Sequence, residues 1–211
     1  MSVSNKHYYS NWGPFVMRTF MHDYEINEIM ENNDLKTIEP FINQYVQYWW
    51  DGWNIFNETD TYKTDFRYIV NKNVFEQKKD DYYNFQNEDY NLTLIAFQKT
   101  PIEIKQEADK DYTKNKKNIT GSLVLNYGEK IPLSINEHKW IPREREVWCF
   151  PSFMKCYLHS FKSEVIRKFV KIDINFGIHP DKVKENELHK YKRIIDNAIS
   201  LLNIDKTESE K

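Results

Sequence analysis

Two residues near the C-terminus, His179 and Asp181, have the H-x-D spacing of a possible metal-binding pair. An imidazole and a carboxylate can together bind a divalent cation. The pair follows the last strand that the sequence predicts, however, and Pro180 between them suits the first turn of a helix. We therefore interpret this segment as a loop-to-helix junction and not as a metal site.

The other residues with reactive side chains show no pattern typical of a further enzyme class. Cys149 and Cys156 are predicted to be reduced thiols, because two cysteines make no disulfide framework. The chain has only 5 Gly, it lacks a glycine-rich phosphate loop, and no Ser or Cys lies in a nucleophile elbow. Four histidines have no metal-ligand spacing with one another: His7, His22, His138 and His189.

Strands must position any site in the second half of the chain. β-type residues bounded by turn residues predict strands at 66–70, 92–97, 122–127, 146–150 and 170–176. The last of these alternates apolar and polar side chains with a period of two. Residues 103–118 are highly charged with both signs mixed, which predicts a solvated insertion and not a binding tail.

Helices are expected on both sides of these strands. After a short strand at 15–20, apolar spacings of three and four predict helices at 23–31 and 35–49, separated by Asn32-Asn33-Asp34. The same spacing predicts a helix at 184–202, and the aromatic residues at 48–56 are expected to be core. The order predicts an α+β fold, a double-stranded β-helix (jelly roll) with N-terminal supporting helices and a C-terminal helix.

We expect one domain over 1–211, with mainly helical support at 1–60, the jelly-roll core at 61–178 and the C-terminal helix at 179–211. The formal net charge of −2 argues against a nucleic-acid partner. No apolar run could span a membrane and no secretory signal is visible, so a cytoplasmic location is expected. Abundant Asn, Lys, Ile and Tyr suggest an AT-rich genome, as in many phages.

The run from Pro142 to Met154, with its Phe150-Pro151-Ser152 element, resembles the 2-oxoglutarate/Fe(II)-dependent dioxygenase superfamily. The likeness continues through residues 164–167 into the last strand and is greatest to the phage, bacterial and prolyl-hydroxylase-like branches. Membership would imply a jelly roll that holds Fe(II) with two histidines and a carboxylate, plus 2-oxoglutarate as cosubstrate.

The resemblance also shows that expected iron ligands are replaced. It places Cys156 where the family has its distal histidine, and Asn87 and Asp89 where the family has its H-x-D pair of iron ligands. Gln86 and Glu88, one residue earlier, fit the positions of that pair equally well. A thiol and an amide do not suit ferrous iron, which predicts a degenerate metal site. A rearranged metal site would use Asp89 with His159, the nearest histidine.

Arg167 stands where the family has the arginine that binds the far carboxylate of 2-oxoglutarate. A guanidinium can bind a carboxylate through two parallel hydrogen bonds. The resemblance thus implies that Arg167 anchors 2-oxoglutarate or another carboxylate. A salt bridge at the start of a strand is the alternative.

These observations favour a pseudoenzyme, a non-catalytic dioxygenase-like jelly-roll protein that acts by binding other protein subunits and needs no cofactor. A phage structural or assembly component, and so a virion location, is the more specific hypothesis. The alternative is an active hydroxylase of a peptidyl or small-molecule substrate that uses Fe(II) and 2-oxoglutarate. A third hypothesis, a J-domain, rests on His179-Pro180-Asp181 and is set aside because a predicted strand precedes that tripeptide.

Overall fold

The computed structural model describes residues 7–9, 14–57, 66–85, 89–115, 119–128 and 136–178. The chain divides into two compact units, one of Met1–Thr61 with Ile69–Asn175 and one of Tyr62–Tyr68 with Phe176–Lys211. Of the second unit only strand residues 66–68 and 176–178 are described. The predicted C-terminal helix, the His179–Asp181 junction and Asn87 lie outside the described residues, and the single domain stays a prediction.

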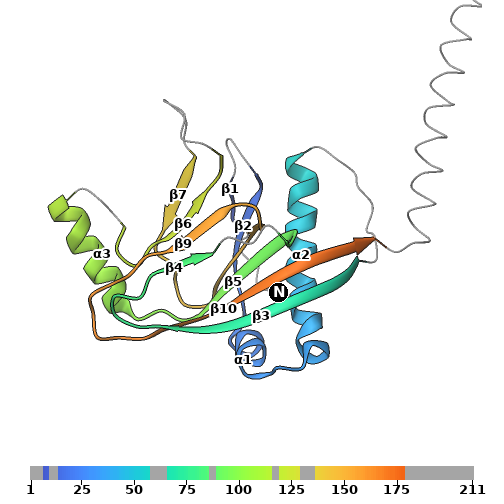
Figure 1. The fold of residues 1–211 in the computed structure, drawn as a ribbon, viewed down its shortest axis with the longest axis horizontal. Helices are drawn as coiled ribbons and strands as arrows, with labels where there is room; N and C mark the ends of the chain where they lie inside the picture. The colour runs from blue at the N-terminus through green and yellow to red at the C-terminus, as the bar shows by residue number, and fades with distance from the viewer. Residues whose placement is uncertain are drawn as a thin grey trace, which may run out of the picture. The chain divides into compact units, whose positions relative to one another are not determined.

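The described strands form two sheets, and every strand pair with a described register is antiparallel (Figure 1). The six-stranded sheet has the order β1 (His7–Tyr9), β2 (Val16–Phe20), β8 (Glu146–Pro151), β5 (Leu92–Lys99), β10 (Arg167–Ile178), β3 (Phe66–Gln77). The four-stranded sheet has the order β4 (Tyr83–Phe85), β9 (Lys155–Leu158), β6 (Leu123–Asn126), β7 (Glu137–Trp140). Within these orders β3 neighbours β10, β4 neighbours β9, β5 neighbours β8 and β6 neighbours β7, a nested arrangement.

Two helices contact the six-stranded sheet. Helix α1 (Asp23–Glu31) contacts β5, and helix α2 (Leu35–Phe56) contacts β2 and β8. The predicted break between them is confirmed, and the Asp34 side chain accepts a hydrogen bond from the Lys36 backbone N–H at the start of α2 (3.1 Å). None of the described helices is long and apolar enough to span a membrane. The predicted combination of helices with antiparallel sheet is therefore confirmed.

The charged segment that the sequence presents as a solvated insertion is largely a helix, α3 (Ile102–Asn115). Ile104 and Ala108, four residues apart, are fully buried. The Glu107 carboxylate accepts hydrogen bonds from the backbone N–H groups of Lys162 (2.7 Å) and Ser163 (2.9 Å). The sequence analysis did not predict this helix, whose residues are mostly exposed, because a narrow apolar stripe and one carboxylate are enough to attach an otherwise polar helix.

The core between the two sheets combines aromatic and aliphatic side chains. Phe169 of β10 stacks on Phe75 of β3 at 4.9 Å between ring centroids and lies 5.6 Å from Phe97 of β5. Such contacts stabilise a core beyond the apolar area they bury. The buried members of this core are Val16, Ile95, Phe97, Leu123, Leu125, Trp148, Phe150, Met154, Cys156, Leu158 and Phe169.

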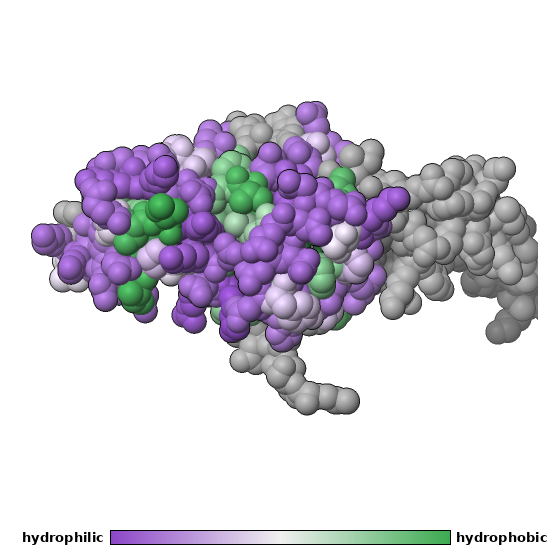
Figure 2. Space-filling view, turned by 90° about the horizontal axis from the view of Figure 1, so that it is seen from below, coloured by the Kyte–Doolittle hydropathy of each residue, from purple (hydrophilic) through white to green (hydrophobic). Residues whose placement is uncertain are grey.

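The molecular face in Figure 2 is mostly hydrophilic, and its hydrophobic side chains gather in separate patches. Scattered apolar residues are normal on the surface of a globular protein.

Two glycines with nearly equal backbone angles provide a matched test of the packing between α3 and the loop before β6. Gly121 (φ +64°) and Gly128 (φ +69°) are both left-handed, but a Cβ at Gly121 would lie 2.2 Å from Ile104 Cγ2, whereas one at Gly128 meets no atom within 4 Å. We expect Gly128→Ala to lower the free energy of unfolding by about 1 kcal/mol through backbone strain. Gly121→Ala should cost about 1 to 3 kcal/mol more through overpacking. Urea denaturation measures both, and equal losses would contradict this packing.

Candidate functional site

One face of β10 carries the polar side chains from which the candidate site is built. Phe169 belongs to the core between the sheets. Because side chains alternate along a strand, Lys171 and Asp173 face the same way as Phe169. Lys171 is 6% exposed and Asp173 only 1%, so charged groups are buried inside the sandwich. The alternation that predicted this strand is confirmed, with its polar positions on the interior side.

Lys171 and Asp173 form a buried ion pair between Nζ and Oδ2. Oδ1 of Asp173 accepts a hydrogen bond from Thr93 Oγ1 of β5 (2.9 Å), and Thr93 Oγ1 lies 2.8 Å from Ser152 Oγ. Because the one Thr93 hydroxyl proton points to Asp173, Ser152 donates to Thr93. We call these four residues, Thr93, Ser152, Lys171 and Asp173, the interior polar cluster.

The interior polar cluster lies beside the position where the resemblance places the distal iron ligand. Lys171 Nζ is 5.7 Å from the centroid of the Phe85 ring, and Phe85 is the register partner of Cys156. Cys156 is a buried free thiol, and burial raises its pKa well above the usual value, with smaller opposing effects of Lys171 and Asp173. Its sulfur therefore stays protonated at neutral pH and is a poor metal ligand.

Arg167, at the start of β10, is fully buried. Its Nε donates to Oε1 of Gln77 on β3 (2.8 Å), Nη2 donates to the same oxygen, and Nη1 donates to the Gly121 carbonyl (2.7 Å). The rings of Phe97 and Phe161 lie 5.7 and 5.6 Å from Cζ. Burial lowers the pKa of Arg167 to about 9, so it is still cationic at pH 7. Within the described ranges no carboxylate pairs with it, and neutral oxygens occupy most of its donors.

His159 follows β9 and is half-buried, with its ring against Tyr82 (5.4 Å between centroids). Burial, and to a smaller extent the Lys139 ammonium, lowers the pKa of His159, so the imidazole is neutral at pH 7. The His159 carbonyl accepts hydrogen bonds from Gln77 Nε2 (3.1 Å) and Arg167 Nη2 (3.4 Å). The backbone of His159 is thus brought to Arg167, while its imidazole packs on Tyr82.

Asp89 is exposed in the turn before β5, and its carbonyl accepts a hydrogen bond from Asn175 Nδ2 (3.0 Å). Asn175 and Arg167 are eight residues apart on β10, roughly 26 Å at about 3.3 Å per residue. Asp89 therefore lies toward one end of the strand and His159 toward the other. The structure does not bring these two predicted metal ligands together.

Across the residues that the structure describes, no group of three or more His, Cys, Asp or Glu side chains could hold a metal ion. The sequence analysis missed the roles of Thr93, Ser152, Lys171 and Asp173. The signal that could have revealed them is a Lys and an Asp two residues apart in a predicted strand whose alternate positions, 170, 172 and 174, are all apolar. Both faces of such a strand are covered when it is central in a two-layer fold.

Comparison with known proteins adds little. No family model matches the chain, and no curated protein matches it. Among solved structures, it is similar to an oxidoreductase of the 2OG-Fe(II) oxygenase family from Burkholderia pseudomallei. The TM-score is 0.41 and the identity 9%, over 81% of this chain and 72% of the other. A likeness at that level establishes neither a shared fold nor a shared activity.

The buried guanidinium predicts a large difference between two arginine substitutions. Arg167→Ala leaves Gln77 Oε1 and the Gly121 carbonyl without a donor, so the free energy of unfolding should fall by about 3 kcal/mol or more. Arg143→Ala removes an exposed arginine and should change it by less than about 0.5 kcal/mol. Urea denaturation checks both values. A small loss for Arg167→Ala would show that its hydrogen bonds are not formed.

The interior polar cluster predicts strong coupling between its two charges. Lys171→Met leaves a buried carboxylate without its cation, which should cost about 3 to 5 kcal/mol of folding free energy. The double variant with Asp173→Asn removes both charges and keeps an acceptor for Thr93, so it should recover at least about 2 kcal/mol of that loss. Chemical denaturation of the two single variants and the double variant gives the coupling. Additive losses would contradict the buried ion pair.

Proposed function

We propose that this chain is a non-catalytic binding protein built on a jelly-roll core. The nested strand order supports the jelly roll, because β3 to β6 neighbour β10 to β7 in reverse order across two facing sheets. In that arrangement one long antiparallel ribbon is folded over on itself. Its interior is then the space that a dioxygenase would use for iron.

One observation carries the non-catalytic assignment, and it is the ammonium of Lys171 inside the sandwich. Its side chain is 8% exposed and pairs with a side chain that is 1% exposed. It lies against Phe85, beside Cys156, the residue that the resemblance equates with the distal ligand. The ammonium occupies the Asp173 carboxylate, so this buried acid is not free to bind a divalent cation, and the nearby thiol stays protonated. The buried ion pair thus lies where a dioxygenase would hold iron and its ligands.

Other protein subunits are the proposed partners, and a phage structural or assembly component is the more specific proposal. Several aromatic side chains are exposed, among them Tyr24, Tyr82, Tyr112 and Phe153, and such residues suit protein interfaces. The Asn-, Lys-, Ile- and Tyr-rich sequence fits an AT-rich phage genome. A cytoplasmic or virion location belongs to the same proposal.

A second candidate, an iron- and 2-oxoglutarate-dependent hydroxylase, is favoured by Arg167 alone. That guanidinium is buried, cationic and, over the described ranges, without a carboxylate partner. The carboxylate of 2-oxoglutarate could supply the missing negative charge if it displaced Gln77 Oε1. Iron in this case would need a rearranged set of ligands that includes Asp89 or His159.

Iron content and 2-oxoglutarate turnover distinguish the two candidates. The chain is reconstituted anaerobically with Fe(II), desalted and analysed for metal, then exposed to O₂ and 2-oxoglutarate while succinate is measured. We expect substoichiometric iron and no succinate above a control with free Fe(II), because the interior carboxylate is already paired with Lys171 and the Cys156 thiol is protonated. One iron per chain with succinate formation, both lost in Asp89→Ala or His159→Ala, would establish the hydroxylase instead.

A further inference from the structure

A cavity of about 520 Å³ lies away from the interior polar cluster. It is lined by Arg18 of β2, by residues 100–102 and 105 at the junction of β5 with α3, and by residues 139–144 at the end of β7 and in the loop that follows it. Small-molecule pockets commonly have volumes of about 300 to 1,000 Å³. The cavity can therefore hold a small organic molecule.

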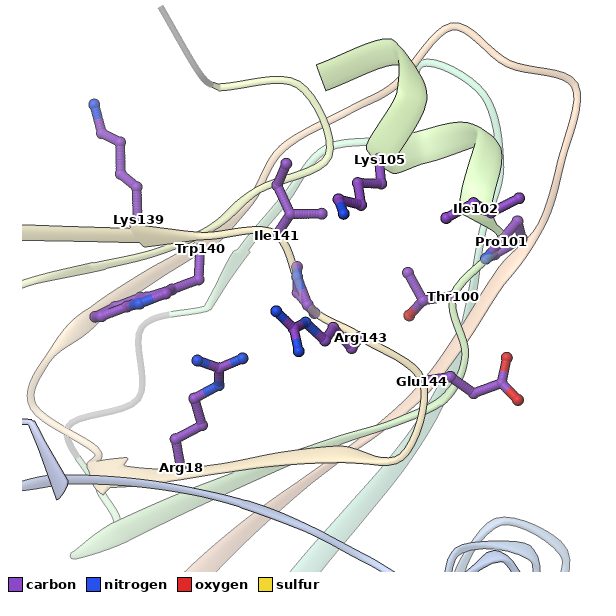
Figure 3. A pocket seen from close by; sticks show the side chains of 11 residues that line it. Arg18, Thr100, Pro101, Ile102, Lys105, Lys139, Trp140, Ile141, Arg143 and Glu144 are labelled. Carbon is purple, nitrogen blue, oxygen red and sulfur yellow. The ribbon is translucent and has the colours of Figure 1, made fainter. Parts of the chain in front are cut away.

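Three cationic side chains reach this cavity from three separate elements. In Figure 3 the side chains of Arg18, Lys105 and Arg143 point into the space between them, while Lys139 and Glu144 point away. Arg18 is the most buried of the three, and its guanidinium lies 5.3 Å from the Trp148 ring centroid. Its position in the cavity wall is therefore fixed by packing.

The charges of the three cations are not equally compensated. Arg18 forms an ion pair with Glu146, which is fully buried and also accepts a hydrogen bond from the Arg143 backbone N–H (3.0 Å). Within the described part of the chain, no acceptor or acid pairs with the side chains of Lys105 and Arg143. The cavity thus presents about two uncompensated positive charges, enough to attract an anion.

A hydroxyl group and apolar walls complete the lining. Thr100 Oγ1 is buried and has no hydrogen-bond partner in the structure. An orphan buried hydroxyl costs free energy unless a ligand or water satisfies it. Pro101, Ile141 and the ring of Trp140 add apolar surface to the same cavity. A ligand that matches all of these groups has an anionic head and a flat or apolar body.

We infer that this cavity binds a small organic anion, with a carboxylate or phosphate group held by Arg143 and Lys105 and an apolar body against Trp140. Arg143 suits either anion, because its planar fork matches two oxygens at once. A nucleic acid fits less well, since the cations meet in one cavity and do not form a stripe, and the net charge is −2. The inference is independent of the proposed function and would hold whether or not the interior binds iron.

Titration calorimetry of the full chain in metal-free buffer without a carboxylate chelator tests the cavity with three probes: phenyl phosphate, phthalate and inorganic phosphate. We expect saturable binding of phenyl phosphate or phthalate, tighter than that of inorganic phosphate because of the apolar wall. The organic probe that binds more tightly identifies phosphate or carboxylate as the preferred head group. Affinity should fall as salt is raised, because the attraction is electrostatic.

Matched variants assign the binding to the cavity. Arg143→Ala and Lys105→Ala should each weaken binding about tenfold, the usual value of one charge-assisted hydrogen bond. Thr100→Val should weaken it less. Lys110→Ala removes the same charge as Lys105→Ala from an exposed position on the same helix and should leave affinity unchanged. Circular dichroism and thermal melts confirm that each variant is folded.

Three results would overturn the inference. The first is no saturable binding of either organic probe. The second is an equal loss of affinity in Lys110→Ala and Lys105→Ala, which would mean a diffuse charge effect. The third is tighter binding of a short single-stranded oligonucleotide that Arg143→Ala and Lys105→Ala abolish, which would assign the surface to nucleic acid. Iron content and succinate formation do not enter any of these measurements.

Discussion

Charge buried along the interior face of β10 is the constraint on which the rest of the structure depends. Arg167, Lys171 and Asp173 are all within the sandwich, where an unpaired charge costs several kcal/mol. Lys171 and Asp173 pair with each other, and two groups from other elements complete the set: Gln77 of β3 for the guanidinium and Thr93 of β5 for the carboxylate. These partners fix the position of β10 between its two neighbours more specifically than apolar packing alone could.

Local signals in the sequence were enough for much of the secondary structure. Apolar spacing and the Asn32–Asp34 break predicted α1 and α2, and period-two alternation predicted β10, because these patterns depend on near neighbours. The same alternation could not tell which face of β10 lies inside, since both faces are covered. Nor could any local pattern pair Arg167 with Gln77, which is 90 residues away.

The candidate site was only partly accessible from the sequence. The resemblance singled out Arg167 and Cys156, which lie in the interior, and also Asp89 and His159, which the fold separates. A ligand position inferred from spacing is valid only if the intervening strands keep the family's register. The sequence pattern gave no sign of the cavity beside α3, because its lining residues at positions 18, 100–105 and 139–144 are far apart in the sequence and meet only in the folded chain.

Helix α3 has a consequence for engineering of the chain. Its charged surface would recommend the segment for inserting a tag, a fluorophore or a fused domain. Yet Glu107 holds the loop at 162–163, and Ile104 packs over Gly121, whose carbonyl binds Arg167. A graft between Ile102 and Asn115 would therefore disturb the environment of a buried cation, and exposed loop positions far from α3 are the safer places for one.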